Sequence, residues 1–187
     1  MEFKKIMENI HFISENLEEK KAERPAFSTE RIKELAYQLY WQSNCECGLV
    51  NAFYDEAGIP INYRRVRSLA LELPHRWNKI CGAVTGAFYV LAATLPKERL
   101  EKAVKEIINY HNRTPLPQFK GRGNTPIPRA KAGSILCRDS IINWCKATKV
   151  NPRSKERAER CARITADIAG KTAELLKKYT GVKVKQR

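Results

Sequence analysis

Six cysteines are the residues of this chain whose type and spacing suggest chemistry. Cys161 lies in a run whose small and apolar residues recur every three or four positions, so it faces the core from a helix that begins near Ser154. Cys137 and Cys145 share one face of the preceding helix, about two turns apart. Their sulfur atoms are too distant to bind one metal ion, although both could flank a multi-atom cluster, or only one of them is a ligand.

Cys81 opens an apolar helix in the segment CGAVTG at 81–86. The free backbone amides and the dipole of a helix N-terminus favour a thiolate there. Gly82 and Gly86 lie one turn apart on one face, and a glycine inside a helix costs about 1 kcal/mol relative to alanine. We therefore expect these two glycines to admit another backbone or a bulky cofactor.

Cys45 and Cys47 are two residues apart, about 200° around a helix, so they cannot both face one site. One of them is expected to be a bystander. Buried cysteine also serves as a small apolar residue, which is the alternative for each position taken singly. Because the set is spread over the apolar faces of several helices, we favour a metal site whose ligands meet only on folding.

The histidines give weaker signals. His75 lies six residues before Cys81 and is expected to be a surface or capping residue, while His11 and His111 belong to no constellation. No Ser-His-Asp order, paired-carboxylate motif or phosphate-binding glycine loop is present.

Helical periodicity runs through almost the whole chain and predicts a single all-α domain of about six or seven helices. Residues 1–24 are expected to form an N-terminal helix or arm, and 25–187 a helical, cysteine-rich redox domain. Within that domain, 112–133 is rich in proline and glycine and is predicted to be an extended arm or crossing loop. The expected helices are 3–20, 28–56, 63–73, 78–95, one starting at 96, 134–149 and one starting near 154.

Composition limits the setting and the partners. In 187 residues the chain has no uninterrupted apolar stretch near its start and none long enough to cross a bilayer, so we expect a cytoplasmic protein without membrane contact. Thiols in that compartment act as metal ligands or redox groups. The net charge of +15, concentrated modestly at 120–131 and 177–187, would attract nucleic acid, an acidic partner or an anionic cofactor. Without a nucleic-acid-binding motif, nucleic acid is not favoured.

The order of these residues also resembles a known family. Asn44-Cys45, the CGAVTG segment, Leu136-Cys137-Arg138 and then Cys161 before an alanine-rich helix are similar to the redox-active proteins named for a CGAxxG motif and four shared cysteines (C_GCAxxG_C_C). The segments at 144–147 and 159–167 resemble the split-Soret cytochrome branch of that family. The resemblance covers roughly 34–176.

This resemblance implies a helical iron–sulfur protein, with a cluster of the [2Fe–2S] type, that transfers electrons as a homodimer. It would act as an electron carrier or redox partner of an unidentified protein rather than as a stand-alone enzyme. By position the ligands would be Cys45, Cys81, Cys137 and Cys161, with Cys145 replacing or supplementing one of them. Gly82 and Gly86 would adjoin the cofactor. No haem is expected, because the C-x-x-C-H sequence of covalent haem attachment does not occur.

Three alternatives stay open at this point. The same thiols could hold a structural zinc ion. They could work as a metal-free thiol redox enzyme or sensor, with Cys81 as the nucleophile. The chain could instead be a basic nucleic-acid-binding module.

Overall fold

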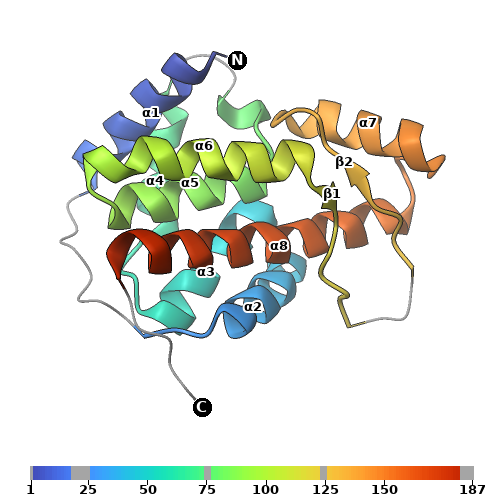
Figure 1. Ribbon diagram of the computed structural model, residues 1–187, viewed down its shortest axis with the longest axis horizontal. Coiled ribbons are helices and arrows are strands. Elements are labelled where there is room, and N and C mark those ends of the chain that lie inside the picture. The colour runs from blue at the N-terminus through green and yellow to red at the C-terminus, as the bar shows by residue number, and fades with distance from the viewer. Residues whose placement is uncertain (1, 18–25, 74–76, 123–125, 182–187) are drawn as a thin grey trace.

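A computed structural model describes residues 2–17, 26–73, 77–122 and 126–181 and shows one mostly helical domain, which confirms the all-α prediction (Figure 1). In these residues the elements are α1 (Phe3–Asn16), α2 (Thr29–Gln42), α3 (Cys45–Ala57), α4 (Tyr63–Leu71), a 3₁₀ turn η1 (Trp77–Lys79), α5 (Gly82–Thr94), α6 (Lys97–Arg113), β1 (Pro115–Leu116), β2 (Ala130–Lys131), α7 (Cys137–Thr148) and α8 (Lys155–Thr180).

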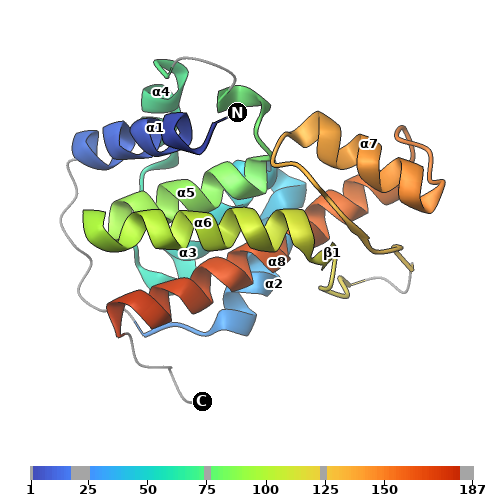
Figure 2. The ribbon, with the colours of Figure 1, turned by 45° about the horizontal axis from the view of Figure 1, so that its top comes forward.

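Helix α5 lies at the centre of the fold (Figure 2). Residues 83–92 are all buried, and α1, α3, α6 and α8 pack against this helix. A helix covered on every side must be apolar all round, which explains why its sequence shows no polar face. The predicted helix at 78–95 is shorter than expected, because η1 and an isolated bridge between Ile80 and Leu136 precede its first turn.

The single helix predicted over 28–56 is wrong. The chain breaks at Ser43 and Asn44, and the described residues therefore contain more helices than predicted. The Asn44 side chain accepts hydrogen bonds from the backbone N–H groups of Glu46 and Cys47, both at 3.0 Å, and caps a new helix. This break places Cys45 at the first residue of α3 instead of in a helix interior.

The proline-rich and glycine-rich segment behaves largely as predicted. Helix α6 extends to Arg113, and no helix occurs in the described residues between it and Cys137. Strands β1 and β2 pair antiparallel, so the two ends of the arm lie side by side (Figure 1). The arm therefore folds back on itself next to α7 and α8.

Helix α1 belongs to the main hydrophobic core, to which Ile6, Ile10 and Ile13 contribute fully buried side chains. It ends at Asn16 rather than at residue 20. The boundary expected after residue 24 lies outside the described residues, so that division stays a prediction. None of the described helices combines the length and apolar character needed to span a bilayer.

Candidate metal centre

Four of the six cysteines line one small cavity at the junction of four helices. Cys45 comes from α3, Cys81 precedes α5, Cys137 begins α7, and Cys161 lies in α8. The other lining residues are Ser140, Ile141, Arg160 and Ile164. All four cysteines are free thiols. The cavity measures about 20 Å³, which is close to the space occupied by one water molecule.

Three of these cysteines stand at helix N-termini. Cys45 and Cys137 are the first residues of their helices, and Cys81 is the N-cap of α5. The helix dipole makes each N-terminus electropositive, equivalent to roughly half an elementary charge, although at α3 the Asn44 side chain already accepts from two of the first amides. Three such ends at one cavity would favour an anionic group bound there, while burial raises the pKa of the three cysteines themselves.

Two buried contacts fix the positions of the first two cysteines. The carboxylate of Glu46, next to Cys45, accepts hydrogen bonds from the Thr85 hydroxyl at 2.7 Å and the Tyr63 hydroxyl at 3.2 Å. These bonds hold the first turn of α3 against α5 and α4. The backbone N–H of Cys81 donates to the carbonyl of Ile135 at 2.7 Å, which ties the start of α5 to the segment entering α7.

The thiols of Cys45 and Cys161 form a hydrogen-bonded pair. The pKa of Cys45 is raised by its hydrogen bond with Cys161 and by burial, so Cys45 keeps the proton. The pKa of Cys161 is lowered, first by that hydrogen bond and then, against the effect of burial, by the positive charges of Arg160 and Arg157. The directions of these pKa shifts favour Cys45 as the hydrogen-bond donor and Cys161 as the acceptor.

The other two thiols favour their neutral forms. Burial, followed by the charges of Cys137 and Cys161, raises the pKa of Cys81 to about 12, although the backbone N–H groups of Ala83 and Val84 oppose this by hydrogen bonding to its sulfur. Burial also raises the pKa of Cys137. Four sulfurs this close cannot all carry charge unless a cation binds between them.

A buried arginine completes the wall of the cavity. Arg160 is only 2% exposed, and its Nη2 donates to the hydroxyl of Ser140 at 2.9 Å while its guanidinium lies 5.2 Å from the Trp144 ring centre. Its Nε has no hydrogen-bond partner in the described part of the chain. Periodicity places Arg160 beside the apolar stripe of α8, so the sequence predicts a position off the core. Its contacts with Ser140 and Trp144 of α7 nevertheless make the burial of Arg160 favourable.

Gly82 and Gly86 are not among the residues that line the cavity, and the expectation that they adjoin a cofactor stays a prediction. A Cβ atom on Gly82 would lie 3.0 Å from the Cβ of Cys45, and one on Gly86 would lie 3.0 Å from the carbonyl oxygen of Glu46. The two glycines thus allow α3 to approach α5, which is the close backbone approach that their spacing predicts. Their effect on the site is indirect, through the position of Cys45.

Comparison with known proteins identifies a family whose pattern includes these four cysteines. The sequence pattern described as "Putative redox-active protein (C_GCAxxG_C_C)" matches residues 43–175, a span that contains all four cavity cysteines. The chain belongs to this family. The resemblance noted in the sequence is confirmed, with one correction: the family is named for GCAxxG, with Gly before Cys, and not for CGAxxG, which is the order of Cys81 and Gly82 in this chain.

This chain is also similar to the split-Soret cytochrome c of Desulfovibrio desulfuricans. The two are 31% identical over 157 residues, which is 76% of this chain and 56% of the cytochrome. The chain thus spans little more than half the length of that relative. A solved structure of the split-Soret cytochrome c from the same organism, reported with a novel iron centre, matches with a TM-score of 0.70 and 26% identity, covering 86% of this chain and 72% of that one.

The two remaining cysteines, Cys47 and Cys145, do not line the cavity that the other four share. Cys47 accepts a hydrogen bond from the Asn51 side chain at 3.4 Å and is the expected bystander of its pair. Cys145, predicted to replace or supplement a ligand, packs instead against a separate cluster that contains Ile127 and Trp144. It lies about two turns from Cys137, and the intervening helix rotation carries it to another side of α7.

The histidines do not join the site either. His111 is fully buried at the end of α6, where burial lowers its pKa to about 4, and it does not line the cysteine cavity. His75 lies outside the described residues. Across the ranges that the structure describes, no three His, Cys, Asp or Glu side chains gather closely enough to hold a single metal ion.

Proposed function

We propose that this C_GCAxxG_C_C protein holds an iron–sulfur cluster of the [2Fe–2S] type and transfers single electrons to or from a partner protein. The observation that carries this proposal is the meeting of Cys45, Cys81, Cys137 and Cys161, from four separate helices, at one cavity. Four cysteine thiolates are the ligand set that such clusters use. Redox activity is the description of the family as a whole.

The residues around the cavity fit an anionic cluster. Three helix N-termini and the buried guanidinium of Arg160 supply positive charge, and the unpartnered Nε of Arg160 is a donor without an acceptor. A multi-atom core needs more room than the cavity of about 20 Å³ provides. The four thiols must therefore turn away from one another about their Cα–Cβ bonds when the cluster binds.

The bound group would supply one-electron chemistry, and the protein would supply charge and access. Four thiolates around an oxidised two-iron core carry a net charge of about −2, which becomes about −3 on reduction. Arg160 and the helix N-termini stabilise the additional electron because they are fixed and close to the sulfurs. Cys137 is exposed, so one edge of the site lies at the protein surface, where a partner can approach.

The iron centre reported for the related split-Soret cytochrome supports iron rather than zinc at these thiols. A homodimer without haem and a cytoplasmic location remain parts of the proposal. Light scattering on the purified protein tests the dimer directly, and a pyridine haemochrome assay tests for haem.

Anaerobic purification followed by iron, sulfide and zinc analysis and visible spectroscopy tests the cluster. We expect iron and acid-labile sulfide in equal amounts and a visible absorption that bleaches on reduction. Replacing Cys45, Cys81, Cys137 or Cys161 with serine should lower the iron content by more than half.

The matched controls are Cys47→Ser and Cys145→Ser, which remove a thiol outside the cavity and should leave iron and colour unchanged. A colourless protein that takes up no iron after anaerobic reconstitution contradicts the proposal, as does stoichiometric zinc without sulfide. Equal loss of iron in the control variants would contradict the ligand assignment.

A further inference from the structure

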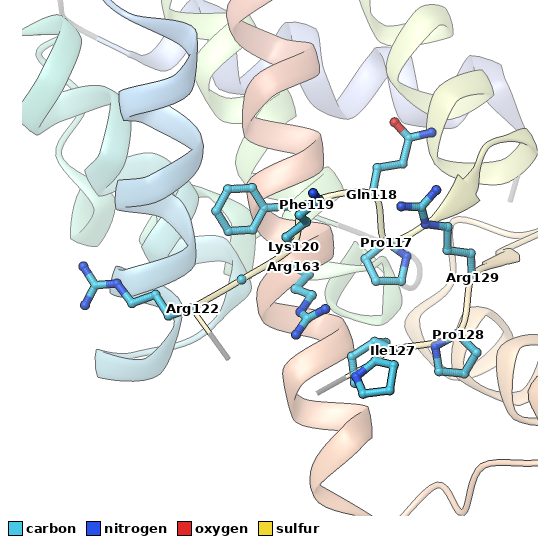
Figure 3. Close-up of a pocket in the computed structure, with 11 residues that line it drawn as sticks. Pro117, Gln118, Phe119, Lys120, Arg122, Ile127, Pro128, Arg129 and Arg163 are labelled. Atoms are coloured by element: carbon cyan, nitrogen blue, oxygen red, sulfur yellow. The ribbon is translucent and has the colours of Figure 1, made fainter. Parts of the chain in front are cut away.

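The arm between β1 and β2 borders a second and larger cavity that is open to solvent and that the proposed redox function does not use. It measures about 570 Å³ and shares no residue with the cysteine cavity (Figure 3). Small-molecule sites commonly occupy about 300 to 1,000 Å³. The lining residues are Pro117, Gln118, Phe119, Lys120, Gly121, Arg122, Pro126, Ile127, Pro128 and Arg129 of the arm, with Arg163 of α8.

Both sides of the arm are fastened to the helices beneath it. On one side, the carboxylate of Asp167 accepts hydrogen bonds from the backbone N–H groups of Gln118 and Phe119, at 2.7 and 2.9 Å. On the other side, the indole N–H of Trp144 donates to the carbonyl of Pro128 at 2.8 Å. Since both attachments are buried or partly buried, the concavity between them is part of the fold.

The lining is strongly basic. It includes Lys120, Arg122, Arg129 and Arg163, and no acidic side chain is found among the lining residues that the structure describes. Figure 3 shows Arg163 on α8, Arg129 on the other side of the arm just before β2, and Arg122 extending away from both. Arg163 is offset by its ion pair with Glu159, so the excess positive charge of the lining comes from Lys120, Arg122 and Arg129, and a bound anion would lower the free energy of these cations.

The neighbouring carboxylate of Glu159 is already hydrogen-bonded. Glu159 accepts from the Tyr37 hydroxyl at 3.0 Å and from Nε of Arg163 at 2.5 Å. Gly121 closes over this pair, because a Cβ there would lie 2.6 Å from the Glu159 carboxylate. These contacts hold the Arg163 guanidinium, which is 5% exposed, in one orientation at the floor of the cavity.

We propose that this cavity binds a small molecule through its phosphate group. The Arg129 guanidinium from one side of the arm and the Lys120 ammonium from the other can both donate charge-assisted hydrogen bonds to one phosphate, whose several oxygens accept from more than one direction. A single carboxylate has only two oxygens and cannot serve both walls equally well. The proline-rich walls and Ile127 leave room beside the cations for the uncharged part of the ligand.

Calorimetric titration of the full-length protein, as purified, tests this site with inorganic phosphate, pyrophosphate, AMP and citrate at low and at physiological ionic strength. We expect Arg129→Gln and Lys120→Gln each to weaken binding of the phosphate-bearing probes about tenfold, since each removes one charge-assisted hydrogen bond. Arg153→Gln, at an exposed position before α8, is the matched control and should leave affinity unchanged.

Tighter binding of AMP than of phosphate would identify a nucleotide-like ligand, and equal binding would identify the phosphate group alone; both support the proposal. Three results overturn it: no phosphate-bearing probe binds at low ionic strength, citrate alone binds, or Arg153→Gln weakens binding as much as Arg129→Gln. The last result would show general attraction to the basic surface. Arg163 is left intact because its bond with Glu159 also supports the fold.

Discussion

Replacing Gly82 with alanine should lower the iron content of the protein strongly while lowering its stability only slightly. The new Cβ would lie 3.0 Å from the Cβ of Cys45 and 3.2 Å from the backbone nitrogen of Glu46. Ordinary contacts of a Cβ begin near 3.4 Å, so the two Cβ atoms must separate by the difference from 3.0 Å, about 0.4 Å. Metal–ligand distances in working sites are held within about 0.2 Å. A shift of that size would move Cys45 relative to Cys81, Cys137 and Cys161 and disturb the ligand geometry that the four share.

The cost to folding is small by comparison. Overpacking of this kind costs about 1 to 3 kcal/mol, and exchanging glycine for alanine in a helix returns at most about 1 kcal/mol. A net loss of up to about 2 kcal/mol lowers Tm by roughly 4 to 8 °C in a chain of this size. Gly82→Ala should therefore be a folded protein with reduced iron, measured by thermal unfolding and by iron and sulfide analysis after anaerobic reconstitution.

Gly170→Ala is the matched control for the glycine exchange. A Cβ there would lie 2.8 Å from Cδ of Lys33, which belongs to a flexible side chain that can swing aside. This variant should keep its full iron content, with a Tm equal to or above that of the parent. The reasoning is refuted if Gly82→Ala binds as much iron as the parent with an unchanged visible spectrum, or if Gly170→Ala loses as much iron.

Three further predictions concern the surrounding fold. Asn44→Ala removes the cap of α3 and should cost about 1 kcal/mol, seen as a lower Tm together with weaker iron retention by Cys45. His111 is held neutral, with its pKa lowered from 6.5 to about 4, so it contributes stability that is present above pH 6.5 and is lost as the pH falls toward 4. That contribution is about 3 kcal/mol, and His111→Gln should remove it from urea unfolding curves recorded between pH 4 and 7. The stability that Asp167 contributes depends on pH in the opposite direction. Burial raises the pKa of Asp167 from 3.8 to about 6. Its contribution of about 3 kcal/mol is therefore present below pH 3.8 and is lost as the pH rises through 6. Asp167→Asn should abolish that loss over the same series of measurements, and an unchanged pH dependence would contradict the assignment for either residue.

The parts of the site that follow from helix periodicity could be predicted from the sequence. Cys161 lies on the buried stripe of a long, regular helix, and Cys137 and Cys81 lie close to strong helix starts. Their convergence could be anticipated only through the family resemblance, because periodicity fixes which face a residue occupies and not which helices meet.

Other features depend on contacts between segments far apart in the chain. Arg160 is charged and lies beside the apolar stripe, and only Ser140 and Trp144 of another helix make its burial favourable. The break before Cys45 lies among residues of low helix propensity, namely Ser43, Asn44, Cys45, Cys47 and Gly48. Asn44 was the available signal, since asparagine is a strong N-cap residue. Cys137 and Cys145 are eight residues apart and so differ by about 80° around the helix axis, which is why a shared face does not bring both thiols to the cavity.

The three helix N-termini around the cysteine cavity attract negative charge to the same extent at every pH at which the protein is folded. Main-chain amides do not titrate, so their attraction for negative charge stays constant from acid to alkaline solution as long as the helices are folded. Lysine or histidine in the same places would lose that attraction within a particular pH range. No single side-chain replacement removes this electrostatic attraction, because it comes from the backbone at the N-termini of three helices.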